Sequence, residues 1–356
     1  MDVTTNFIDH SIRRVAALEV DELPLGRKVR LVVDLIEDGL GRAVRIPVVA
    51  VRGKRAGPVV GLTCALHGNE LNGIPVVHRL IELLDPKTLR GTVVVCPVLN
   101  ISGFNDHKRR YRDGKDLNHL MPGVEDGNES QIYAYRLFER IASRFDVLID
   151  LHTASFGRIN SLYVRADMEN PVTARMAYLQ RPRIILHNPP SDHTLRGAAA
   201  ERGIPAITVE IGDPQVFQPR HIRPTLAGVR AVLSHLRMLP KRVISDSATP
   251  IVCADSRWIY TAHGGLLDVL PGVAEQVERG ATIARQIDIF GDLVCEYRAP
   301  ADGVVIGKSV NPVCPTGARI LHLGRIAGPE DGLLSANEAA VGAGRTLTHS
   351  DLSHGG

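Results

Sequence analysis

The chain has 356 residues, of which 44% are hydrophobic and 23% charged, and its formal net charge is only +3. These values are typical of a soluble globular protein longer than one ordinary domain, so we expect a large core and a smaller second unit. The small net charge argues against a nucleic-acid partner. Because no apolar run reaches transmembrane length and the first 20 residues lack a signal-peptide core, we predict a cytoplasmic protein without a membrane partner.

The five cysteines, Cys64, Cys96, Cys253, Cys295 and Cys314, are widely spaced and form no Cys-x-x-Cys motif. This usage favours small buried residues in a reducing compartment over disulfides or a cysteine nucleophile.

Strand and helix patterns alternate over the first 240 residues. The turn-forming stretch Glu37-Asp-Gly-Leu-Gly41 separates two strand-like runs and predicts an antiparallel hairpin at a sheet edge. Further strands are expected at 59–66, 92–98, 147–151, 162–165, 184–187 and 206–211, with helices from about 72, over 129–144, near 172, from about 194 and up to about 239. The order predicts an α/β fold with a mostly parallel mixed sheet covered by helices.

The texture of the sequence changes after Pro240. A linker is predicted at 245–250, and the short β-like runs between turns at 251–324 predict a small all-β barrel or sandwich. The remainder is rich in Gly, Ser and Ala without a clear period, which predicts disorder. We therefore expect a catalytic domain over 1–245, a β domain over 246–326 and a disordered tail over 327–356.

The tetrapeptide His67-Gly-Asn-Glu70 lies at the corner between a predicted buried strand and a predicted helix. His67 is thus expected at the carboxyl end of a strand, where open α/β sheets bind ligands. His152 ends another such strand. Two histidines and a glutamate with an open fourth position are a known catalytic zinc site, although His-x-x-Glu alone is a weak signal that more often marks a solvated loop.

Glu210 lies inside the apolar run of a third predicted strand. A buried carboxylate requires a partner, a raised pKa or a function. It fits the general base that takes a proton from a zinc-activated water, and the alternative is a structural ion pair with Arg196 or Arg202.

Residues 100–128 form a long polar segment between predicted elements. Its mixture of Arg, Asn and Tyr with a few apolar residues favours a substrate-binding loop, and a basic surface loop is the alternative.

Four ordered motifs resemble the succinylglutamate desuccinylase and aspartoacylase family of the zinc carboxypeptidase-like superfamily. They are His67-Gly-Asn-Glu70, Asp116-Leu-Asn118 followed by Pro122-Gly123, Asp150-Leu-His152-Thr and Val209-Glu210-Ile-Gly212. The resemblance covers about residues 25–325 and implies one zinc ion per chain, bound by His67, Glu70 and His152. It makes Glu210 the general base and then the acid of amide hydrolysis.

The resemblance also implies roles in substrate binding. Arg109, with Arg110 as the next candidate, would polarise the scissile carbonyl. Asn118 and Arg196 would contact the substrate. His119 stands where the family usually has an arginine, and a neutral imidazole binds a carboxylate less firmly than a guanidinium does.

We therefore expect a zinc-dependent deacylase that removes an acyl group from a small N-acylated amino acid or related amine. The alternatives are a carboxypeptidase acting on short peptides or peptide-like conjugates, and a non-catalytic binding protein with the same fold. The acyl group, the amine and the oligomeric state stay open, a homo-oligomer being one option.

Overall fold

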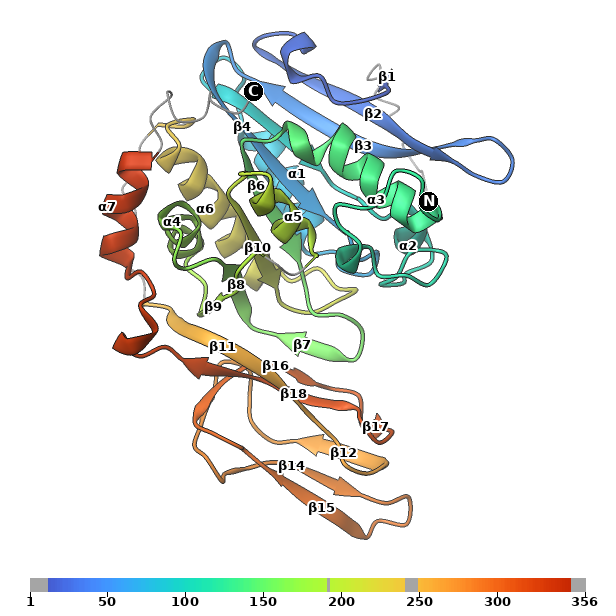
Figure 1. The fold of residues 1–356 in the computed structure, drawn as a ribbon, viewed down its shortest axis with the longest axis vertical. Helices are drawn as coiled ribbons and strands as arrows, with labels where there is room; N and C mark the ends of the chain where they lie inside the picture. Colours follow the sequence, from blue (N-terminus) through green and yellow to red (C-terminus); the bar gives the residue numbers. More distant parts are fainter. Residues whose placement is uncertain (1–11, 191–192, 241–248, 347–356) are drawn as a thin grey trace, which may run out of the picture.

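A computed structural model describes residues 12–190, 193–240 and 249–346. In these residues one long sheet runs through the molecule in the strand order β1-β2-β3-β5-β4-β6-β10-β8-β9-β11-β18-β16-β13, and β7 pairs with β16 (Figure 1). A second sheet has the order β15-β14-β12-β17.

The centre of the long sheet is mostly parallel. Strand β4 (Arg55–Cys64) pairs in parallel with both β5 (Arg90–Cys96) and β6 (Val147–His152), and β6 pairs in parallel with β10 (Ala206–Ile211). Strand β8 (Leu162–Ala166) is antiparallel to β10, and β9 (Ile184–His187) is parallel to β8. The predicted fold class is confirmed.

The predicted hairpin lies next to one edge of this sheet, where β1 is the outermost strand. It consists of β2 (Arg27–Glu37) and β3 (Ala43–Arg52), which pair in antiparallel register. The short strand β1 (Arg13–Val15) and the 3-10 turn η1 (Val20–Glu22) precede it.

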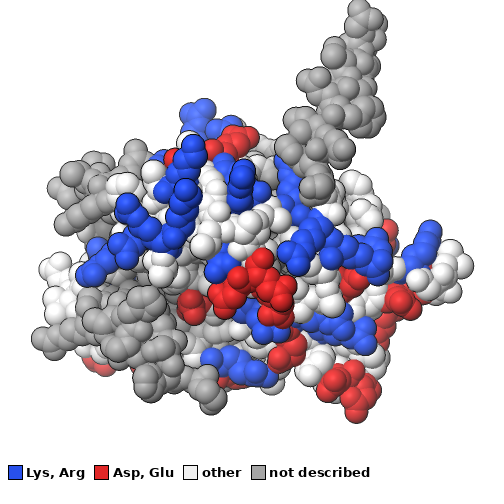
Figure 2. Space-filling view, turned by 90° about the horizontal axis from the view of Figure 1, so that it is seen from above, with Lys and Arg blue, Asp and Glu red and all other residues white. Residues whose placement is uncertain are grey.

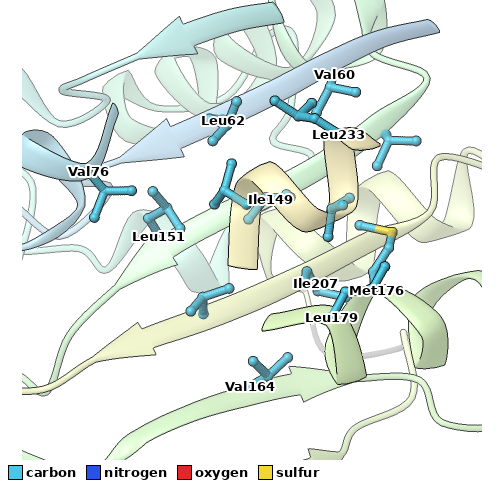
Figure 3. Packing of buried hydrophobic residues seen from close by; sticks show 14 of the residues in the cluster. Val60, Leu62, Val76, Ile149, Leu151, Val164, Met176, Leu179, Ile207 and Leu233 are labelled. Carbon is cyan, nitrogen blue, oxygen red and sulfur yellow. The ribbon is translucent and has the colours of Figure 1, made fainter. Parts of the chain in front are cut away.

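Helices cover both faces of the sheet, because its central strands are apolar on both sides. One face carries α1 (Gly73–Leu83), α4 (Pro171–Gln180) and α6 (Pro219–His235). Figure 3 shows this core, where Leu62, Ile149 and Ile207 from three strands meet Met176 and Leu233 from helices.

The opposite face carries α2 (Ile101–Asn105), α3 (Glu129–Arg140) and α5 (Leu195–Glu201), together with the 3-10 turns η2 (Leu117–His119) and η3 (Ala142–Arg144). Tyr133 and Phe138 of α3 pack there against Leu148 of β6. Leu148 points away from its neighbour Ile149, as alternation along a strand requires.

The C-terminal β region extends the long sheet, since β11 (Ile251–Tyr260) pairs in parallel with β9. Strands β18 (Arg319–Ile326), β16 (Gly303–Ser309) and β13 (Gln276–Val277) continue it in antiparallel register. The second sheet contains β12 (Gly265–Val269), β14 (Thr282–Ile287), β15 (Leu293–Arg298) and β17 (Val313–Cys314). A separate core that includes Ile283 and Leu321 lies in this region. The predicted C-terminal β region is thus confirmed, while the predicted linker and the 245/246 boundary fall largely on residues 241–248, outside the described residues.

The prediction of a disordered tail is wrong for part of its length. Residues 329–346 contain η4 (Pro329–Asp331) and α7 (Ala336–Thr346). Ala339 is fully buried in the core beside α4, and Tyr178 Oη donates a hydrogen bond of 3.0 Å to the Leu334 carbonyl. The small residues of α7 let the helix pack closely. The same Gly- and Ala-rich composition shows no clear hydrophobic period, and for that reason the sequence predicted disorder. Residues 347–356 lie outside the described range.

Charged side chains of both signs share the surface. Figure 2, which looks onto the molecule from above, shows a group of acidic side chains with Lys and Arg around it. Within the described residues, no helix has the length and apolar character needed to span a membrane.

Candidate active site

The His67–Glu70 corner follows β4 directly and leads into α1. A turn closes it, with the Glu70 N–H donating to the His67 carbonyl over 3.0 Å. Gly68 is required there, because a Cβ atom on it would lie 1.9 Å from the Gly103 carbonyl carbon in α2. Buried Asn72 donates from Nδ2 to the Ile211 carbonyl over 2.7 Å and so ties the corner to the end of β10.

The structure brings together the three predicted metal ligands. His67 Nδ1 lies 2.9 Å from Glu70 Oε1, His152 Nδ1 lies 2.9 Å from Glu70 Oε2, and the two Nδ1 atoms are 3.2 Å apart. All three side chains are at most 3% exposed. Their donor atoms fall within 4.8 Å of one another, so they can share a single ion.

A carboxylate orients each imidazole from its other nitrogen. His152 Nε2 donates to Asp150 Oδ2 over 2.7 Å, and His67 Nε2 lies 3.0 Å from Asp116 Oδ1. Asp150 in turn accepts a hydrogen bond of 2.7 Å from Thr63 Oγ1 on β4. With hydrogen on both Nε2 atoms, both Nδ1 lone pairs face the same point, which is the arrangement of carboxylate–histidine–metal sites.

This set of donors fits a zinc ion. In a tetrahedral site with Zn–N distances of 2.0–2.1 Å, two ligand atoms lie roughly 3.3 Å apart. The Nδ1–Nδ1 separation of 3.2 Å is close to that value. Two nitrogens and one carboxylate oxygen also leave a fourth position open, as catalytic zinc sites do.

Charge interactions within the site overcome the cost of burial. Burial opposes ionisation of Glu70, but His67 and His152 hold the pKa of its carboxyl well below the ordinary value. Burial likewise disfavours a charged His152, yet Asp150 and Glu70 raise its pKa well above the ordinary value. The pocket therefore stabilises positive charge between these side chains, as a cation site requires.

Glu210 lies beside this group on the neighbouring strand, directly opposite His152 in the register of β10 and β6. Its Oε2 accepts a hydrogen bond of 3.2 Å from Asn160 Nδ2, and its Oε1 lies 3.7 Å from Arg165 Nε. Burial, reinforced by the negative charge of Glu70, raises the pKa of Glu210 despite the opposing charge of Arg165.

The ion partner of Glu210 is neither of the two arginines considered from sequence. Arg202 donates to Glu139 Oε1 over 2.8 Å, and buried Arg196 donates to the backbone carbonyls of Asn188 and Pro189. Tyr163 lies opposite Glu210 in the antiparallel register of β8 and β10, and Arg165 lies two residues farther along β8. The contact between Arg165 and Glu210 therefore depends on this register and could not be predicted from the sequence.

The predicted binding loop brings Arg109 to the predicted metal ligands. Its guanidinium donates to Glu70 Oε1 and Asp116 Oδ2, each over 2.9 Å, and to Ser155 Oγ. Arg110 is exposed and donates to the Gly114 carbonyl. Of the two arginines, Arg109 is the one that contacts Glu70, and both line the cavity described below.

The other predicted substrate-binding residues lie farther from the centre of the site. Asn118 Oδ1 accepts a hydrogen bond of 2.9 Å from the Leu195 N–H at the start of α5. The His119 side chain is 68% exposed, with Nε2 3.8 Å from Asp116 Oδ2. Arg196 is 1% exposed and supports the segment at 188–189. None of the three is among the residues that line the cavity described next.

A cavity of about 570 Å³ opens beside the site. Its lining includes Asn69, Arg109 and Ser155 from the catalytic side and Arg158, Asn311 and Arg319 from the region of β7 (Arg158–Asn160) and the C-terminal strands. The volume suits a small molecule.

Comparison with known proteins identifies the family of the chain. Residues 56–236 match the family described as the succinylglutamate desuccinylase/aspartoacylase catalytic domain. The chain belongs to this family. Members of the family hydrolyse the amide bond of N-acyl amino acids, so the protein is an amide hydrolase.

Individual relatives are distant. The N-alpha-acetyl-L-2,4-diaminobutyric acid deacetylase of Halomonas elongata is 25% identical over 281 residues, covering 75% of this chain and 81% of the relative. The product-bound ectoine utilization protein EutE (DoeB) of Ruegeria pomeroyi has a TM-score of 0.77 and 21% identity over 85% of this chain and 98% of its own. A succinylglutamate desuccinylase/aspartoacylase structure from Rhodobacter sphaeroides has a TM-score of 0.75 and 20% identity, covering 86% and 98%.

Proposed function

We propose that this protein is a zinc-dependent deacylase that hydrolyses the amide bond of a small N-acylated amino acid or related amine. The observation that carries the proposal is the pair of imidazoles whose Nδ1 atoms face each other across Glu70, each held from behind by a carboxylate. A zinc ion bound by His67, Glu70 and His152 would act as a Lewis acid toward the carbonyl oxygen and acidify water.

Glu210 is the group assigned to proton transfer. Its raised pKa suits a base that accepts a proton from the attacking water and then donates it to the leaving nitrogen. Water adds its oxygen to the carbonyl carbon, the C–N bond breaks, and the products are a carboxylate and an amine. Asn160 fixes one oxygen of Glu210 and leaves the other directed toward Arg165.

Arg109 is assigned to the carbonyl oxygen. It lines the cavity, and its contacts with Glu70 and Asp116 fix the guanidinium before substrate binds. A cation held in advance near the developing negative charge stabilises the transition state without reorganisation.

The test combines metal content with turnover. Purified protein is expected to contain about one zinc per chain. His67→Ala, Glu70→Ala and His152→Ala should each lose the metal, whereas His78→Ala, an exposed histidine on α1, should keep it. Full metal content in all three site variants would contradict the ligand assignment.

Turnover of the zinc-loaded protein is then measured on N-acetyl and N-succinyl amino acids and on short peptides. Release of free amino acid from the acyl compounds is the expected result. Release of a C-terminal residue from peptides alone would favour the carboxypeptidase alternative. Full zinc without turnover of either class would favour a binding protein.

A further inference from the structure

The short strand β7 lies beside Glu210 but pairs with the C-terminal β region. It is antiparallel to β16, with Asn160 opposite Gly307 (Figure 1), and within the described residues it pairs with no other strand. Two further backbone hydrogen bonds of 2.9 and 3.2 Å continue the pairing beyond its ends, from the Val310 N–H to the Gly157 carbonyl and from the Ser161 N–H to the Ile306 carbonyl. The C-terminal β region therefore sets the position of β7.

Asn160 connects this strand to the carboxylate of Glu210. Its Nδ2 donates to Glu210 Oε2 over 3.2 Å, and the Glu210 side chain is only 12% exposed. A hydrogen bond to one oxygen of a carboxylate also determines where the other oxygen points, because both belong to one planar group. A shift of β7 would therefore turn the carboxylate even if β10, which bears Glu210, did not move.

Gly307 allows the close approach of β7 and β16 at this point. A Cβ atom at position 307 would lie 2.2 Å from Asn160 Oδ1 and 2.9 Å from the Ile159 carbonyl oxygen, and both distances are shorter than van der Waals contact. The φ angle of Gly307 is not in the left-handed region, so its backbone conformation does not require glycine. The space taken by Asn160 does.

The other side of Gly307 is firmly supported. Gly307 lies opposite His322 of β18, and Ile306 before it is the extra residue of a β-bulge, a feature that redirects strands next to active sites. His322 is buried and stacks on Trp258, with ring centroids 4.7 Å apart and an interplanar angle of 7°. A side chain at position 307 would thus displace Asn160 and β7 more readily than β16.

We propose that Gly307 is a positioning residue for hydrolysis, which acts through Asn160 to fix the direction of the Glu210 carboxylate. The inference rests on the proposed function, in which Glu210 transfers the proton. It gives the C-terminal β region a part in the reaction beyond lining the cavity. The expected effect is large, because a displacement of about 1 Å in a reacting group can cost about a hundredfold in rate.

A double-mutant cycle of Gly307→Ala and Asn160→Ala tests this coupling on an N-acetyl amino acid. Each single variant, loaded with zinc, should lower kcat about tenfold to hundredfold with little change in KM, because the base acts in the transition state. The double variant should be no slower than Asn160→Ala, since the added methyl group then has no amide to displace. Losses that multiply in the double variant, a normal kcat in either single variant, or a change in KM alone would overturn the proposal.

The control is Gly264→Ala, which makes the same change in the same β region. A Cβ atom on Gly264 would have its nearest neighbour, the Cys314 carbonyl oxygen, at an ordinary contact distance of 3.7 Å. This variant should keep the wild-type kcat and KM. If Gly307→Ala does not fold, a folded double variant with the kcat of Asn160→Ala supports the coupling, because truncation of Asn160 has then removed the clash. A double variant that also fails to fold overturns it.

Crystal structures separate this proposal from the proposed function. If no acyl compound is hydrolysed, or if Glu210→Gln is fully active, the assignment of Glu210 as the base fails, but the direction of its carboxylate can still be observed. In Gly307→Ala the contact between Asn160 and Glu210 should be broken and the carboxylate turned, whereas Gly264→Ala should keep both. An unchanged contact in Gly307→Ala would overturn the role of Gly307 and leave the deacylase intact.

Discussion

The cluster of side chains at the strand ends and the wall of the neighbouring cavity differ in how their charges are balanced. In the strand-end cluster, at the ends of β4, β6 and β10, His67 and His152 each contact Glu70 and a second carboxylate. On the wall formed by β7 and the C-terminal strands, Arg158 and Arg319 lie on Trp258 without a carboxylate partner among the described residues. In the strand-end cluster each imidazole thus has two carboxylates beside it, whereas the two arginines of the cavity wall have none in the part of the chain that the structure describes.

This difference separates turnover from selectivity. If the strand-end cluster and Glu210 act on the reacting groups, as proposed, substitutions there should reduce the hydrolysis of every substrate by the same factor. Substitutions of the arginines that line the cavity should change the ratio between substrates that differ in charge. The following predictions test that separation from the strand-end side.

Glu210→Gln should have the largest effect among the variants that retain metal. The amide keeps the size of the side chain but cannot accept the proton, so kcat should fall about a hundredfold or more. The loss should be equal for N-acetyl-L-glutamate and N-acetyl-L-glutamine. Steady-state kinetics with zinc content measured on the same sample provides the check, and near-normal turnover in the zinc-loaded variant would remove Glu210 as the base.

Asp150→Asn should have the next largest effect. Asn can still pair with Thr63 and His152, but the loss of the charge behind His152 should weaken metal affinity or activity about tenfold to hundredfold. Asp146→Asn is the control, since Asp146 lies just before the same strand and accepts from the Val59 N–H, away from the site. Competition with a chelator measures the metal affinity. Equal affinities in the two variants would show that Asp150 has only a structural role.

The strand-end cluster was predictable because each of its residues can be recognised from the few residues around it in the sequence. His152 and Glu210 stand at or next to the end of apolar strands, and His67 follows such a strand within three residues. Parallel strands bring these ends to one edge, so the strand pattern alone places the three residues together. The acidic partners behind the imidazoles follow only from the structure, although Asp150 is two residues from His152 and so shares its face.

The cavity wall with Arg158 was not predictable, because the residues that form it are far apart in the sequence. Arg158 and Asn160 lie on a three-residue strand that lacks an apolar run, and their partners Trp258 and Gly307 are about 100 and 150 residues away. Only the pairing of β7 with β16 connects them. Arg196 and Asn118, for which the resemblance implies substrate contact, each bond to backbone in the structure, and their role toward the substrate stays a prediction.

Arg165→Gln should have the smallest effect and should depend on pH. Arg165 Nε lies 3.7 Å from Glu210 Oε1, where its positive charge favours the ionised base and opposes the rise in the Glu210 pKa that burial causes. Without that charge the pKa of Glu210 rises further, so the acidic limb of the kcat/KM profile should move to higher pH. Well above this limb, where Glu210 is ionised in both proteins, kcat/KM should stay within about tenfold of wild type, because the base itself is still present. Arg165→Lys keeps the charge and should keep the limb near its wild-type position. A pH–rate profile of wild type and the two variants provides the measurement. If Arg165→Gln lowers kcat/KM by the same factor at every pH, Arg165 acts through packing and not through the pKa of Glu210.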